Sequence, residues 1–174
     1  MTLSMYQASI PIFRQMLENL AAILDKGAAH AAARKIEPGV LLGLRLYPDM
    51  ISLVGQVQIA TDHAKGASAR LAGVEVPKYV DNETSFEDLK KRIHRTLDFI
   101  GKLTPAQIDG SEDREIALSL AGQSRIFKGQ NYLINFALPN FYFHVTTAYD
   151  ILRHSGVELG KRDFIGLSNI GKPA

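Results

Sequence analysis

The sequence predicts a single domain that folds as a mainly α-helical bundle. Three stretches repeat apolar residues at the three-and-four spacing of an amphipathic helix, within residues 4–25, 51–71 and 85–103. A fourth stretch, residues 131–156, has the highest density of apolar and aromatic residues and closes on a glycine. Because no linker or internal repeat separates these segments, we expect one domain over residues 1–174.

The first helix is expected to begin near Ser4, a residue type that caps helix N-termini. The alanine-rich residues 28–34 have high helix propensity, so they either continue this helix or form a short second one. Pro38-Gly39 should end the helical segment, and the apolar residues 40–47 should pack as a linker.

The second long helix should have Pro48-Asp49 in its first turn and Gly73 as its C-cap. Its second half is rich in alanine, glycine and serine around His63. Small side chains allow another helix to approach closely, or leave room for a ligand beside this histidine.

In the third helix, Thr84 or Ser85 fits the N-cap position and Thr104-Pro105 should stop the helix. A continuous apolar stripe predicts one buried face. The basic residues between the stripe positions are then expected to form the solvated face; they are Lys90, Lys91, Arg92 and Arg95.

Residues 115–120 alternate apolar and small or polar side chains, and residues 125–127 are expected to pair with them across a turn at 121–124. This predicts a short β-hairpin before the last helix. Pro139 should kink that helix or mark a fresh start, because proline removes a backbone donor. The glycine-rich residues 157–174 are expected to pack loosely.

Composition excludes several classes of function. The chain is 46% hydrophobic and 22% charged, with a net charge of +2, which is typical of a globular domain. Cations do not cluster without acids, so nucleic-acid binding is not expected. The absence of cysteine excludes disulfides, thiolate zinc sites and thiol catalysis. No membrane span or secretory signal is visible, so we expect a cytoplasmic protein with no membrane partner.

His63 and His144 are the candidate site residues. In a bundle their helices can be neighbours, and two imidazoles with oxygen donors would suit zinc or nickel. Asn140 lies one helical turn before His144 and is a third candidate ligand. His154 is about 80° away from His144 around the helix, so it does not join them. The alternative is that His144 is a core residue hydrogen-bonded within the bundle.

Four segments together resemble a bacterial domain-of-unknown-function family in the DinB/YfiT-like superfamily. They are Met5-Tyr6-Gln7-Ala8-Ser9, Val57-Gln58-Ile59-Ala60-Thr61-Asp62-His63-Ala64-Lys65-Gly66, Phe141-Tyr142-Phe143-His144-Val145-Thr146-Thr147-Ala148-Tyr149 and Leu152-Arg153-His154-Ser155-Gly156-Val157. The resemblance extends from about Met5 to Gly166. It implies a DinB-like up-down four-helix bundle, commonly a homodimer.

The resemblance also implies a metal site, since superfamily relatives bind a divalent metal through three histidines. One comes from the second helix, which His63 matches, and two come from the last helix, which Asn140 and His144 match. Asn140 is therefore a departure that leaves the three-imidazole site incomplete. Two functions follow: a weak or degenerate metal site that acts on a small molecule through metal-bound water, or a non-enzymatic homodimeric binding or stress-associated protein with a metal-free pocket.

Overall fold

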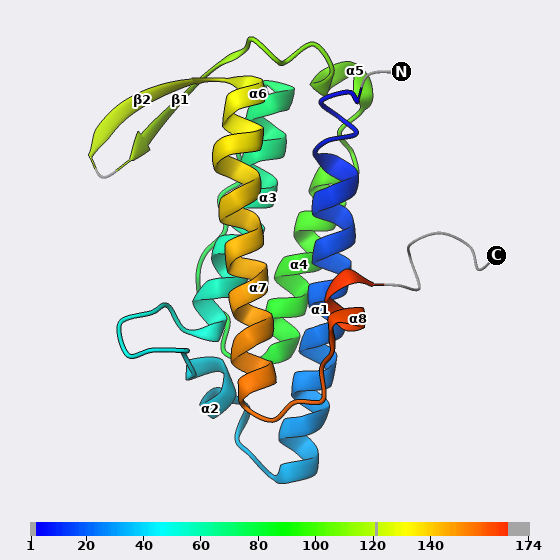
Figure 1. Ribbon diagram of the computed structural model, residues 1–174, viewed down its shortest axis with the longest axis vertical. Helices are drawn as coiled ribbons and strands as arrows, with labels where there is room; N and C mark the ends of the chain where they lie inside the picture. The colour runs from blue at the N-terminus through cyan, green and yellow to red at the C-terminus, as the bar shows by residue number, and fades with distance from the viewer. Residues whose placement is uncertain (1–2, 121, 167–174) are drawn as a thin grey trace, which may run out of the picture.

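The computed structural model describes residues 3–120 and 122–166, and it consists of four long helices, a β-hairpin and several short helices (Figure 1). This confirms the predicted mainly helical bundle with a hairpin before the last long helix. The long helices are α1 (Ile10–Arg34), α3 (Leu53–Ala72), α4 (Phe86–Ile100) and α7 (Leu138–His154). In the described part of the chain, no helix is long and apolar enough to cross a membrane.

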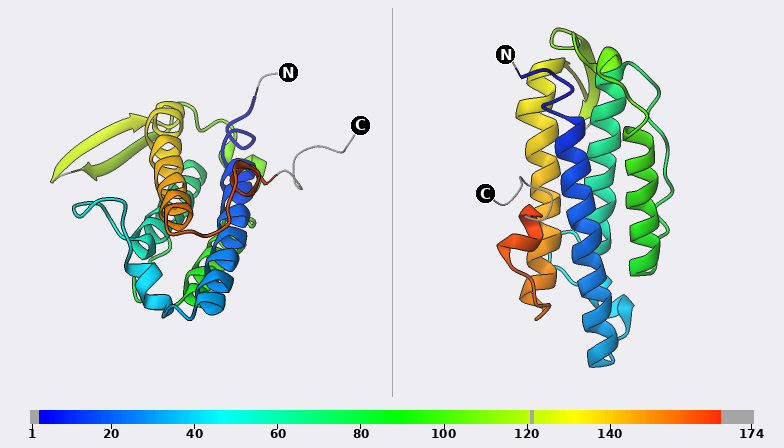
Figure 2. Two further views of the ribbon diagram at one scale, coloured as in Figure 1. Left: turned by 60° about the horizontal axis from the view of Figure 1, so that its bottom comes forward. Right: turned by 90° about the vertical axis from the view of Figure 1, so that its right-hand side faces the viewer.

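The helix directions refine the expected up-down arrangement. α3 packs against both α7 and α4, and α1 packs against α4. The segment between α3 and α4, residues 73–85, runs back along the bundle, so α3 and α4 point in the same direction (Figures 1 and 2). α7 runs antiparallel to α3, and this pair has the most extensive helix–helix interface in the bundle.

α1 is one continuous helix that includes the alanine-rich segment and ends where Lys35 adopts a left-handed conformation (φ 54°). It begins at Ile10 and not near Ser4, since Ser9 is its N-terminal flanking residue and residues 5–9 form a turn. Gly27 does not interrupt it. A Cβ at Gly27 would lie 3.0 Å from Phe86 and 3.2 Å from Leu152, so this glycine permits close packing of three helices.

The predicted linker after α1 contains a short helix, α2 (Pro38–Gly43), in which proline occupies the first turn instead of ending the helix. α3 starts at Leu53, later than the expected Pro48-Asp49. Its C-cap is confirmed, because Gly73 has a left-handed conformation (φ 69°).

The N-cap of α4 is confirmed: the backbone N–H of Asp88 donates to Ser85 Oγ at 3.0 Å. The helix ends at Ile100, and α5 (Pro105–Ile108) follows the expected Thr104-Pro105 stop. The prediction that Arg92 lies on the solvated face is wrong. Its side chain is only 2% exposed, because acids of the α3–α4 connection surround it.

The hairpin consists of β1 (Glu115–Leu120) and β2 (Gln123–Lys128), which pair antiparallel. Leu120 pairs with Gln123, so the second strand begins two residues earlier than expected. The hairpin projects from one end of the bundle beside α6 (Gly129–Tyr132) (Figure 1).

α6, a π-helical segment (Leu133–Ala137) and α7 follow one another without a break. The π segment directly precedes the first turn of α7, which contains Pro139. Proline removes an i→i−4 hydrogen bond, and a π turn is one way in which a helix accommodates such a change. Pro139 therefore lies within a continuous helical run, in the first turn after the π segment, and does not begin a separate helix.

The prediction of a loosely packed tail is wrong for residues 157–166. Helix α8 (Lys161–Ile165) lies on α1, where Asn19 Nδ2 donates to the Phe164 carbonyl and Gln15 Nε2 to the Ile165 carbonyl, both at 3.0 Å. Glycines made this tail look featureless, but its apolar residues Val157 and Leu159 are buried. Residues 167–174 lie outside the described part of the chain.

Candidate functional site

The structure brings His63 of α3 and His144 of α7 together. The centroids of the two rings are 5.8 Å apart and their planes are inclined by only 16°. The small residues of α3 explain this proximity: Ala60, Ala64 and Ala67 are fully buried and allow α7 to approach. The expectation that the two helices are neighbours is confirmed.

A glutamine fixes the orientation of the His144 ring. His144 Nδ1 lies 2.7 Å from Gln56 Oε1, and Gln56 Nε2 donates to the Ile51 carbonyl at 3.1 Å. Because a carbonyl can only accept, the amide nitrogen of Gln56 must face Ile51, which leaves Oε1 to accept from His144. His144 therefore carries its proton on Nδ1 when neutral, and its Nε2 has a lone pair.

Burial keeps both imidazoles neutral. The pKa of His63 is lowered from 6.5 to about 4, first by burial and then by the neighbouring His144, while Asp62 opposes the shift. Burial also lowers the pKa of His144. Two neutral imidazoles in one place are suitable metal ligands, since a protonated ring cannot bind a cation.

The amide nitrogen of Asn140 is engaged within its own helix. Its Nδ2 donates to the Phe136 carbonyl at 2.7 Å, along its own helix. Within residues 3–120 and 122–166, no group of three or more His, Asp or Glu side chains is arranged to hold a metal ion. His63 and His144 would supply two imidazoles, half of a tetrahedral zinc shell, and the remaining positions would need water, ligand oxygens or the Asn140 amide oxygen.

A cavity of about 320 Å³ opens beside His63, between α3, the π segment and the hairpin. Its wall combines polar groups of Arg70 and Tyr132 with the ring of Phe136 and hairpin residues 117–120. Phe136 contacts His63 directly, with ring centroids 6.0 Å apart. The cavity is large enough for a small molecule, and a ligand in it would contact His63.

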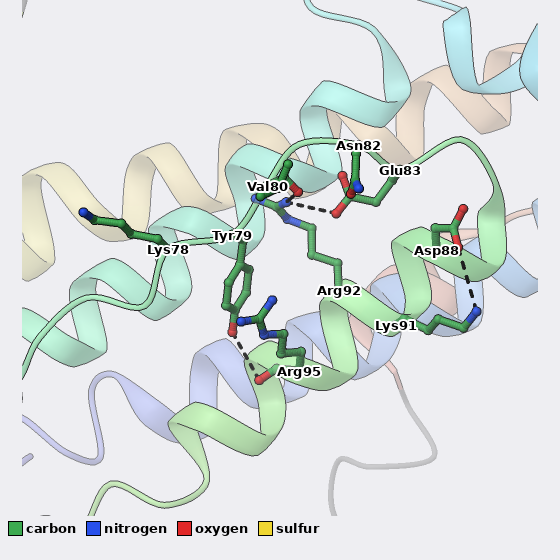
Figure 3. A pocket seen from close by; sticks show the side chains of 9 residues that line it. All are labelled: Lys78, Tyr79, Val80, Asn82, Glu83, Asp88, Lys91, Arg92 and Arg95. Atoms are coloured by element: carbon green, nitrogen blue, oxygen red, sulfur yellow. Dashed lines mark hydrogen bonds and ion pairs between the residues drawn. The ribbon is translucent and has the colours of Figure 1, made fainter.

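A larger cavity, of about 630 Å³, lies between α4 and the α3–α4 connection and contains no histidine (Figure 3). Arg92 forms ion pairs there with Asp81 at 2.8 Å and Glu83 at 3.0 Å, and with Asp62 at 2.8 Å. Arg95 lies over the ring of Tyr79, 4.1 Å from its centroid. These contacts hold the connection against the bundle, so we assign this cavity a structural role.

Sequence reasoning missed Gln56, Arg70 and Tyr132. A signal for Gln56 was available, because a polar residue interrupts the apolar stripe two helical turns before His63, on the same face. Nothing in the spacing marks Arg70 or Tyr132, which meet only in the folded chain, where the Tyr132 hydroxyl accepts from Arg70.

The family described as "Domain of unknown function (DUF1993)" matches residues 5–165. Among solved structures, the chain is similar to the crystal structure of a DinB family member protein from Shewanella denitrificans at 1.83 Å resolution. The two share 40% sequence identity with a TM-score of 0.87, over 97% of this chain and 95% of that one. No curated protein matches the chain.

Proposed function

The chain belongs to the DUF1993 family, and we propose that it is a small-molecule-binding protein whose His63 and His144 hold a divalent metal ion weakly. The resemblance to the DinB-like superfamily is confirmed by the similar DinB family structure. Family membership does not by itself indicate a metal or a small-molecule ligand. We propose both from the arrangement of the two imidazoles.

The observation that carries this proposal is the stacked His63–His144 pair with Gln56 behind it. A hydrogen bond to one ring nitrogen is what normally orients a metal-ligating histidine and selects the nitrogen that binds. Gln56 gives His144 this support, and it does so from inside the bundle, where it is 1% exposed. The ring of His63, whose centroid lies 5.8 Å from that of His144, would supply a second nitrogen ligand.

His63 and His144 would have different roles. His63 lines the cavity, so it can contact both an ion and a bound molecule. His144 is buried behind it and is oriented by Gln56. A divalent ion held by the pair, zinc or nickel, would supply Lewis-acid chemistry to a molecule in the cavity.

A second candidate, a metal-free binding protein without catalysis, is favoured by Asn140. The third position that relatives fill with histidine offers only an amide oxygen here, since the Asn140 Nδ2 is engaged by the Phe136 carbonyl, and an amide oxygen is a weaker zinc ligand than an imidazole. In this case the neutral imidazole of His63 would be a polar part of the cavity wall, with His144 packed behind it. The homodimer and the cytoplasmic location stay predictions; light scattering of the purified protein would check the first.

Metal binding separates the two candidates. Purified protein is stripped with a chelator and titrated with zinc and with nickel, and the same is done for His63→Ala and His144→Ala. His94→Ala, which removes an exposed imidazole from α4, is the matched control. The first candidate requires binding that both site variants lose and the control keeps, whereas the second requires no specific binding in the unmodified chain.

A further inference from the structure

Arg70 occupies an unusual position at the cavity beside His63. It lies near the end of α3, and its guanidinium folds back over Gly66, one turn earlier on the helix. A Cβ on Gly66 would lie 2.6 Å from Arg70 Nη1, so any larger residue there would displace the guanidinium. The absence of a side chain at Gly66 thus leaves the space that the Arg70 guanidinium occupies.

Arg70 has no acidic partner among the described residues, although it is partly buried. Asp62, the acidic residue of the cavity wall, is already paired with Lys65 at 2.7 Å and Arg92 at 2.8 Å. Arg70 Nη1 donates instead to the hydroxyl of Tyr132, at 3.2 Å. Arg70 therefore presents to the cavity a guanidinium that makes no direct ion pair within the described residues.

Tyr132 adds a second donor. Its side chain is 1% exposed, and its hydroxyl oxygen accepts from Arg70. The hydroxyl hydrogen has no acceptor in the part of the chain that the structure describes. Arginine binds planar anions such as carboxylates with two parallel hydrogen bonds. The adjacent hydroxyl can donate a further hydrogen bond to the same carboxylate.

The rest of the cavity suits an apolar group. Phe136 and the hairpin residues Leu118 and Leu120 form its other surfaces, and Phe136 also contacts the rings of Tyr132 and His63. A phosphate dianion would find only one cation here and a carboxylate, Asp62, on the same wall. A monoanion with an apolar body fits both halves of the cavity.

We propose that this cavity binds a small organic carboxylate, with its headgroup on Arg70 and Tyr132 and its apolar body against Phe136 and the hairpin. The inference deepens the proposed function, since it names the class of molecule that lies beside His63. The carboxylate site depends on Arg70 and Tyr132, whereas the metal site depends on His63 and His144. Either proposal can therefore be wrong while the other holds.

The test measures binding of benzoate and hexanoate by NMR titration of chelator-treated protein, with benzamide and hexanamide as neutral analogues. The carboxylates should bind at least tenfold more tightly than their amides, and Arg70→Gln should remove this preference. Arg153→Gln, which removes an exposed arginine from α7, should keep it. Equal binding of acid and amide, an unchanged preference in Arg70→Gln, or no saturable binding of either carboxylate would overturn the proposal.

Gly66→Ala is a second variant that keeps the charge but moves it. Alanine is favourable within a helix and its methyl group meets only Arg70, so the melting temperature should not fall. Benzoate binding should weaken several-fold nonetheless. If Gly66→Ala binds benzoate as the unmodified chain does, the position of the guanidinium is not what recognises the anion, and the proposal is wrong.

His144→Ala separates this inference from the metal. His144 does not line the cavity, so benzoate binding should survive in that variant and without metal. Benzoate that binds only to metal-loaded protein would show a ligand held by the ion, which contradicts this proposal and supports the metal site. Benzoate binding in a chain that binds no metal would support the carboxylate site and contradict the proposed metal site at His63 and His144.

Discussion

Gln56 Oε1 and His144 Nδ1 lie 2.7 Å apart inside the bundle, and this contact determines which nitrogen of His144 is available. Gln56 cannot turn its amide round without losing its bond to the Ile51 carbonyl. The loop backbone just before α3 thus fixes the glutamine, the glutamine fixes the imidazole, and the imidazole presents Nε2.

Gln56→Leu should weaken zinc binding by about 10–100-fold, because His144 loses the partner that orients it. It should also lower the free energy of unfolding by about 1–3 kcal/mol, since a buried ring N–H is left without an acceptor. Competition with a chromophoric chelator measures the first effect and urea unfolding the second. Gln56→Glu, which keeps an acceptor, should retain most of the zinc affinity; equal affinity in Gln56→Leu would show that the glutamine does not orient a ligand.

Asn140→His should raise zinc affinity by tenfold or more, because it adds an imidazole one turn before His144. Asn140→Ala should change the affinity little, since an amide oxygen is a weaker zinc ligand than an imidazole. Isothermal titration of both variants tests this pair of outcomes. A large loss in Asn140→Ala would mean that the asparagine is itself an important ligand, through the amide oxygen that its bond to Phe136 leaves unused.

The stability of the protein should fall on acidification through His63. The pKa of His63 is 6.5 in its reference state and about 4 in the fold, so between these values the unfolded chain binds a proton that the folded chain does not. Stability is then full above about pH 6.5 and is lost towards pH 4, by at most about 3 kcal/mol.

Urea unfolding at several pH values across this window measures the effect. In His63→Gln the loss of stability should be smaller by that amount, whereas His94→Gln, at an exposed position, should behave as the unmodified chain. If the His63 variant keeps the full pH dependence, the imidazole is not held neutral by its surroundings.

Arg92→Leu should destabilise the fold by about 3–5 kcal/mol, because it leaves buried and half-buried acids without their cation. Arg92 pairs with Asp62, Asp81 and Glu83, and its Nε donates to Thr61 Oγ1 at 2.8 Å. Figure 3 shows the pair with Glu83. Amide hydrogen exchange should rise in residues 73–85, which these pairs attach to the bundle. Lys91→Leu is the control: its amine is exposed and lies 3.8 Å from Asp88, so little change is expected.

Much of the fold could be predicted because the buried faces of α1, α3, α4 and α7 are continuous apolar stripes. Arg92 could not be placed, since its burial depends on acids in the α3–α4 connection, whose path no periodicity specifies. The same connection makes α3 and α4 parallel, which helix spacing alone does not reveal. The packed segment before α8 was missed because Val157 and Leu159 are single apolar residues among glycines and charges.

The site was predictable in part. His63 and His144 could be paired because small residues on α3 allow α7 to come close, and the structure places their rings 5.8 Å apart. The amide of Asn140 could not be oriented from sequence, since its bond to Phe136 depends on the helix geometry after the π segment. Arg70 and Tyr132 are 62 residues apart and meet only in the folded chain.

The most direct test of the central proposal is the metal content of the chain purified after growth with added zinc and nickel. We predict that the unmodified protein, or protein reloaded after chelation, binds about one divalent ion per chain through the imidazole pair. His63→Ala and His144→Ala should each abolish that binding, and His94→Ala should not. No stoichiometric metal in the unmodified chain, or metal that both site variants retain, would contradict the proposal.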